Sequence, residues 1–146
     1  MFIEFIQTGD ALKESGVTGN INERANYTAN TGTALISTAN SGLDGTGTTA
    51  TVITEAGSGT LIKNIICKAQ ANTTKGMIRL FISSGGTIVL VDEIEVQAVI
   101  QSAIAASFER SFNVNYYLMA GASLLASTQN AERFVITALG LDISHP

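Results

Sequence analysis

Residues 76–96 read GMIRLFISSGGTIVLVDEIEV, and this stretch decides the fold class. Before the two central glycines, three aliphatic residues alternate with residues of the opposite face, which is the two-residue period of a β-strand: Ile78, Leu80 and Ile82. Gly85-Gly86 supplies the positive backbone angles that a tight hairpin turn requires. We therefore expect an antiparallel β-hairpin across this turn.

The second strand of this hairpin combines aliphatic residues with three carboxylates near its end. Strict alternation predicts one face, interrupted by Asp92, with four aliphatic residues: Ile88, Leu90, Ile94 and Val96. Asp92 then points away from Glu93 and Glu95, so the three carboxylates do not converge as calcium ligands would. We interpret them as a solvated strand end, with a salt bridge to Arg79 or Arg110 between subunits as the alternative.

Further short strands are spaced regularly from residue 50 to about residue 143. No long amphipathic helix interrupts them, although 97–107 fits a helical turn as well as an irregular strand. The last two strands, 124–127 and 133–142, are expected to form a hairpin with three inward residues: Phe134, Ile136 and Ala138. The pattern predicts an all-β fold, an antiparallel two-sheet β-sandwich that is jelly-roll-like.

The expected strand at 61–69 is apolar on both of its faces, whereas a sandwich strand with one face in water alternates apolar and polar residues. Alternation divides its apolar residues into two sets: Leu61, Ile65 and Cys67 on one face, Ile62 and Ile66 on the other. The second face needs a cover. A neighbouring subunit or the N-terminal part of the chain could supply it.

Residues 1–49 differ from the rest of the chain in composition. Thr, Asn, Gly, Ala and Ser dominate from residue 7, and the only charge between residues 28 and 50 is Asp44. Too few large aliphatic residues are present for an independent core. We predict an extended N-terminal arm over 1–49 and a β-sandwich domain over 50–146. A flexible tail is the alternative, and either the chain's own C-terminal domain or a neighbouring subunit would order the arm.

Charged residues make up only 14% of the 146 residues, against about 25% in an average soluble domain. So few charges predict a surface that is partly covered by other subunits. The net charge of −4 argues against nucleic-acid binding, which needs clustered Lys and Arg. No segment has the length and apolarity of a membrane helix or a signal peptide. We therefore expect no membrane partner and a protein that stays in the cytoplasm until it is assembled.

Residues that carry catalysis or bind metals are scarce. A single Cys and a single His leave no disulfide framework and no structural zinc site. His145, beside the last residue, is the only candidate general base, and a tail residue is the simpler interpretation. Cys67 lies in an apolar run and is expected to be buried. Residues 44–47, Asp-Gly-Thr-Gly, resemble a fragment of a calcium or phosphate loop without its other ligands. We predict no catalytic, cofactor-binding or metal-binding residue, no cofactor and no enzymatic activity.

Tyr116 and Tyr117 could form a stacking platform for a sugar, as aromatic faces do in carbohydrate-binding modules. Packing in the core or at an interface is the competing interpretation. It is favoured because neighbouring residues of a strand point to opposite faces.

Residues 118–138, LMAGASLLASTQNAERFVITA, resemble a signature of small virion proteins of tailed bacteriophages. Members of that group resemble this chain in order as well, with an opening like 60–65, then 79–82 before a glycine-containing hairpin, then a strand like 93–96. The resemblance spans about residues 50–143 and includes no catalytic motif. It implies a β-sandwich that decorates the capsid or joins a head-fibre or tail structure, usually as a multimer.

The resemblance and the scarcity of charge lead to one functional hypothesis, a non-enzymatic structural protein of a phage particle. We expect an auxiliary or decoration protein on the capsid surface that packs with sister subunits, a trimer being favoured. The major capsid protein or other virion proteins would be its further partners. The alternative is a receptor- or carbohydrate-binding module of a tail or fibre tip.

Overall fold

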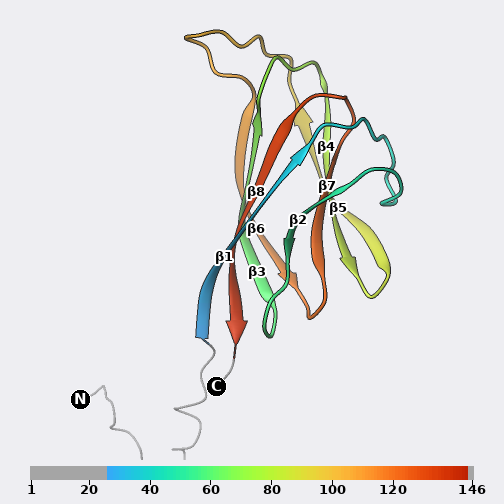
Figure 1. Ribbon diagram of the computed structural model, residues 1–146, viewed down its shortest axis with the longest axis vertical. Helices are drawn as coiled ribbons and strands as arrows, with labels where there is room; N and C mark the ends of the chain where they lie inside the picture. The colour runs from blue at the N-terminus through green and yellow to red at the C-terminus, as the bar shows by residue number, and fades with distance from the viewer. Residues whose placement is uncertain (1–25, 145–146) are drawn as a thin grey trace, which may run out of the picture.

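The computed structural model describes residues 26–144, and over this range it contains eight β-strands and no helix (Figure 1). The strands are β1 (Asn26–Ile36), β2 (Ala50–Thr54), β3 (Thr60–Ala69), β4 (Gly76–Ser84), β5 (Thr87–Val96), β6 (Glu109–Leu118), β7 (Ser123–Thr128) and β8 (Phe134–Ser144). The described part of the chain accordingly offers no helix with the length and apolarity to cross a membrane.

The strands form two four-stranded antiparallel sheets. Sheet A has the order β1-β8-β3-β6 and sheet B the order β2-β7-β4-β5. Hydrogen-bonded pairs are nested: β4 pairs with β5, β3 with β6, β2 with β7 and β1 with β8. Eight strands wrapped into two sheets in this way make a jelly roll. The predicted all-β sandwich and its jelly-roll-like character are confirmed.

The hairpin at the centre of this nesting is the one expected from the sequence. Ser84 lies opposite Thr87 across the turn, and Gly85 and Gly86 have φ angles of 59° and 85°. Both angles lie in the left-handed region, as the tight turns that match strand twist require. Ile78 and Leu80 on the inner face of β4 are fully buried.

The core lies between the inner faces of the two sheets. β3 and β8 provide its centre in sheet A, and Phe134 packs edge to face against Phe108 with ring centroids 6.4 Å apart. Cys67 is buried there as predicted, and burial raises the pKa of its thiol to about 12. A thiol with this pKa stays protonated and unreactive near neutral pH.

A bulge in β3 corrects the predicted division of its apolar residues. Ile62 lies opposite Gly140 of β8 and Asn64 lies opposite Leu139, so Lys63 is an extra residue. One extra residue reverses the alternation of the strand. The fully buried residues are therefore Ile62, Ile65 and Cys67, while Leu61 and Ile66 lie on the outer face.

A second bulge corrects the predicted faces of β5. Leu80 lies opposite Asp92 and Phe81 lies opposite Leu90, so Val91 is the extra residue. Ile94 and Val96 point into the core as expected. Before the bulge the alternation is reversed, so Leu90, opposite Phe81, and Ile88, opposite Ser83, lie on the outer face of sheet B.

The predicted hairpin between the last two strands is wrong, because β7 and β8 belong to different sheets. β7 pairs with β2 and β4, whereas β8 pairs with β1 and β3. The turn residues between them carry the chain from one sheet to the other, so that each strand buries its own apolar face. The three predicted inward residues of β8 are buried: Phe134, Ile136 and Ala138.

The predicted boundary at residue 49 does not mark the edge of the folded unit. Residues 26–36 form the whole of β1, which pairs with β8 along its full length, from Asn26 with Ser144 to Ile36 with Phe134. The chain's own sandwich therefore supplies the surface that orders this part of the predicted arm. Residues 1–25 lie outside the described residues.

Residues 37–49, which we name the strap, cross the outer face of sheet B (Figure 1). The Asn40 amide donates to the Thr128 carbonyl of β7 at 2.8 Å, and Gly45 lies against Ile88 of β5. Because β4 lies between β7 and β5, the strap passes over Phe81, which is fully buried although it points away from the core.

Candidate interaction surface

The structure separates the two tyrosines that could have formed a sugar platform. The Tyr116 hydroxyl donates to Asp92 Oδ2 at 2.9 Å on the inner side, whereas the Tyr117 hydroxyl donates to the Ser58 carbonyl at 3.0 Å on the outer side. The predicted packing role holds for Tyr116, and the two-ring platform is wrong.

Two of the three carboxylates of β5 bind other side chains of the chain, and the third, Glu95, is exposed. Glu93 accepts a hydrogen bond from Arg79 Nε at 3.0 Å, and the two residues lie directly opposite each other within one chain. Asp92 points inward and accepts from Tyr116, which joins the edge of sheet B to the edge of sheet A. Desolvation, followed by the bond to Asp92, raises the pKa of the Tyr116 phenol. Among residues 26–144, no cluster of three metal-binding side chains occurs.

The loop fragment at residues 44–47 is satisfied by its own chain. Asp44 Oδ1 accepts from the Thr46 hydroxyl at 2.7 Å and from the Thr46 amide at 3.1 Å, and these bonds lower the pKa of the carboxyl group. Asn40 donates to two further strap carbonyls, at Thr46 and Thr48. These contacts shape the strap and leave no set of ligands for an ion. His145 lies outside the described residues.

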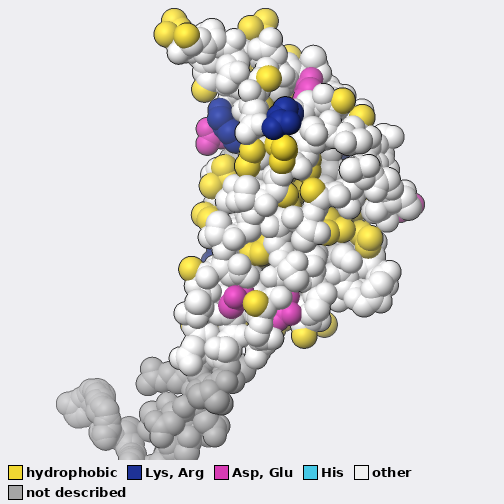
Figure 2. Space-filling model, in the orientation of Figure 1, with side chains coloured by type: hydrophobic (Ala, Val, Ile, Leu, Met, Phe, Trp, Pro, Cys, Tyr) yellow, Lys and Arg dark blue, Asp and Glu magenta, His cyan; other side chains and the backbone are white. Residues whose placement is uncertain are grey.

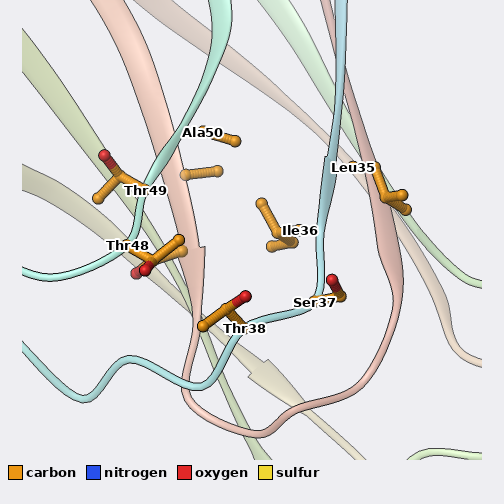
Figure 3. A pocket seen from close by; sticks show the side chains of 9 residues that line it. Leu35, Ile36, Ser37, Thr38, Thr48, Thr49 and Ala50 are labelled. Carbon is orange, nitrogen blue, oxygen red and sulfur yellow. The ribbon is translucent and has the colours of Figure 1, made fainter.

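A small cavity of about 80 Å³ lies where the strap leaves β1 and joins β2 (Figure 3). Ile36 and Ala50 point toward each other across it, and Leu35 points away. Its lining side chains carry methyl and hydroxyl groups and no charge. Ligand pockets commonly measure about 300–1,000 Å³, so this cavity is too small for a sugar or a nucleotide.

The connection between β5 and β6 forms the tip of the molecule, at the end opposite the first residues of β1 (Figure 1). We name residues 97–107 the apex loop. It is irregular, with bridges only between Thr73 and Val99 and between Ser102 and Ala105. The helical interpretation of this segment is therefore wrong.

Most of the apex loop is apolar and exposed. Ile104 is 98% exposed and Ile100 is 79% exposed, and the smaller apolar residues around them are exposed as well: Ala98, Ala103, Ala105 and Ala106. No charged residue occurs in the loop. Figure 2 shows hydrophobic side chains at this tip. Scattered exposed apolar residues are ordinary, whereas a contiguous uncharged set is typical of contact surfaces.

Hydrogen bonds from the neighbouring β3–β4 connection hold the apex loop in place. Thr73 exchanges two backbone bonds with Val99, at 2.9 and 3.2 Å, and its buried hydroxyl donates to the Gln97 carbonyl at 2.7 Å. The Gln101 amide donates to Asn72 Oδ1 at 2.8 Å, and the Ser107 hydroxyl donates to the Ala71 carbonyl. An anchored loop loses little conformational entropy when it binds, which favours affinity.

The apex loop was not identified as a site from the sequence, where the same residues allowed a helix or an irregular strand. The available signal was the combination of Ile100 and Ile104 with a run that lacks charge from residue 96 to residue 108. Periodicity assigns secondary structure but does not tell whether an apolar residue faces the core or solvent.

Comparisons with known proteins find no sequence relative and a weak structural likeness. No family model matches the sequence, and no curated protein does. Among solved structures, the chain is similar to one described as "Cyanophage Pam1 capsid asymmetric unit", with a TM-score of 0.40 and 11% identity. The match covers 94% of this chain and 98% of that chain. A likeness at this TM-score carries no functional argument.

Proposed function

We propose that this protein is a non-enzymatic structural component of a tailed-phage particle, an auxiliary or decoration protein on the capsid surface. The observation that carries the proposal is the apex loop, which presents Ile100 and Ile104 to solvent on an anchored, uncharged tip. Burying one such side chain contributes about 1.5–3 kcal/mol, so a partner groove that accepts both gains several kcal/mol. The resemblance of residues 118–138 to small virion proteins supports the same assignment.

The proposed partners are sister subunits and neighbouring capsid or other virion proteins, with a trimer as the favoured assembly. A jelly roll is compatible with many functions, so the fold does not select among them. Adhesion is favoured over catalysis because Glu93 and Asp92 bind Arg79 and Tyr116 of their own chain, and the cavity beside the strap is small and uncharged. A sugar-binding role at a tail or fibre tip is not favoured, because Tyr116 and Tyr117 do not form a common stacking platform.

The test replaces both apex isoleucines in the full chain, Ile100→Ser with Ile104→Ser. We expect this variant to lose self-association in sedimentation velocity and to be depleted from purified particles, measured as copies per particle by mass spectrometry. The matched control is Val89→Ser with Leu43→Ser, which removes two exposed apolar side chains away from the apex.

Two results would contradict the proposal in different ways. Wild-type protein that stays monomeric at micromolar concentration argues against contacts between sister subunits. An apex variant that enters particles at the wild-type copy number excludes the apex loop as the attachment surface.

A further inference from the structure

The outer face of sheet A carries a second apolar area, which lies at the end where β1 begins. Tyr27 of β1 faces Ile143 of β8 in the pairing of these strands. In the next row Leu141 of β8 faces Leu61 of β3, and Leu61 faces Tyr117 of β6. These five residues and two neighbours on the same face, Ala29 and Leu139, form an apolar set that we name the outer patch. Its members are Tyr27, Ala29, Leu61, Tyr117, Leu139, Leu141 and Ile143.

The outer patch is open in the described structure. Tyr27 is 62% exposed, Tyr117 48% and Leu139 38%, whereas the strap buries Phe81 completely on sheet B. Four strands are about 14 Å wide from first to last, so the patch can accommodate one further stretch of chain.

One charge lies beside the outer patch. The charged residues on this face are Lys63, Lys68 and Glu109, and the last two lie opposite each other at the far end of the sheet. Lys63, in the bulge of β3, is exposed, and its ammonium group donates to Asn115 Oδ1 at 3.0 Å. The patch therefore favours a partner that is apolar and carries a carboxylate.

The first six residues of this chain have that chemistry. They read Met-Phe-Ile-Glu-Phe-Ile, in which five large apolar side chains flank Glu4. The chain enters the described structure at Asn26, next to Tyr27, which is itself part of the patch. Nineteen residues, 7–25, join the two segments, and a linker of that length has a root-mean-square span of about 24 Å.

We propose that residues 1–6 bind the outer patch of their own chain, with Glu4 beside Lys63. Tethering through 19 residues gives an effective concentration in the millimolar range, so a second copy at micromolar concentration competes poorly. Binding at the patch does not depend on the proposed virion role or on the apex loop.

The experiment measures the accessibility of the patch in the full chain through Leu139→Cys and maleimide labelling near pH 7. Cys67 is fully buried and stays unlabelled unless the protein unfolds, so it serves as an internal check of folding. We expect Phe2→Ser with Phe5→Ser to speed labelling at position 139 about fivefold or more. Leu12→Ser with Val17→Ser, which changes apolar residues of the linker, is the matched control and should leave the rate unchanged.

A charge exchange tests the predicted pairing. Lys63→Glu should speed labelling at position 139, and adding Glu4→Lys to it should restore the slow rate. If the labelling rate at position 139 is unchanged by the Phe2→Ser and Phe5→Ser substitutions, the proposal is wrong. Protection that appears only as protein concentration rises from about 1 to about 100 µM also overturns it, because the occupant is then a second copy.

Discussion

The outer faces of the two sheets differ in what covers them. On sheet B the strap binds β7 through Asn40, lies against β5 through Gly45 and buries Phe81. On sheet A no described segment covers the apolar rows, and Tyr27 and Tyr117 remain exposed. The scarcity of charge therefore has two sources within one chain. The apolar outer face of sheet B is covered by the strap, whereas the apolar outer face of sheet A is exposed.

The largest expected effect tests whether the two outer faces differ in this way. Phe81→Ala removes a fully buried ring beneath the strap and should lower the free energy of unfolding by about 3–5 kcal/mol. Leu139→Ala, on the open face, should cost less than about 1 kcal/mol. Urea denaturation of both variants gives the two values, and equal losses would mean that the strap does not distinguish the faces.

A second prediction isolates the contact between strap and sheet. Gly45 has φ of 88°, and a Cβ added there would lie 2.4 Å from Ile88 Cγ2. Gly45→Ala should therefore cost about 2–4 kcal/mol, from backbone strain together with the clash. Gly85→Ala is the matched control, since φ is 59° and nothing lies within 4 Å, and it should cost about 1–2 kcal/mol. If the control loses as much stability as Gly45→Ala, the strap is not packed against β5.

The smallest effect concerns the edge where the two sheets meet. Tyr116→Phe removes the bond to Asp92 and should cost about 1–2 kcal/mol at neutral pH. The phenol has a higher pKa in the folded protein than in the unfolded chain, so its contribution is complete below about pH 10 and is lost as pH rises further.

The pH series provides the check on that assignment. Wild-type stability, measured by urea denaturation, should decline above about pH 10, and Tyr116→Phe should decline less steeply. Tyr117→Phe retains Tyr116 and should retain the wild-type decline. If the stability of wild type and of Tyr116→Phe declines equally with pH, Tyr116 does not connect the two sheets.

The sequence was sufficient for the fold class and for the central hairpin, because alternating aliphatic residues flank Gly85-Gly86 and need only local information. It was insufficient where a single residue decides the outcome. Lys63 and Val91 each reverse the alternation of a strand, and nothing in their side chains marks them as bulges. Such bulges depend on pairing partners that are distant in sequence.

Two further differences came from long-range pairing. β1 has the Thr, Asn and Gly composition of a loop, and it becomes a strand because β8 offers it a complete edge. β7 and β8 have the spacing of a hairpin, yet each pairs within its own sheet. Of the candidate surface, Ile100 and Ile104 were visible as residue types, but their exposure is a property of the folded apex loop, which Thr73 anchors and which periodicity does not predict.

The nested pairing also has a consequence for how the protein is made. β1 is the first strand to be translated and its partner β8 is the last. Ile36 therefore cannot pair until Phe134 has been synthesised. At about 5–20 residues per second, β1 stays unpaired for roughly 5–20 s on the ribosome. A strand of Val, Ile and Phe would be prone to aggregate during that delay. The Thr, Asn and Gly of β1 thus suit a segment that has to remain soluble while the rest of its sheet is synthesised.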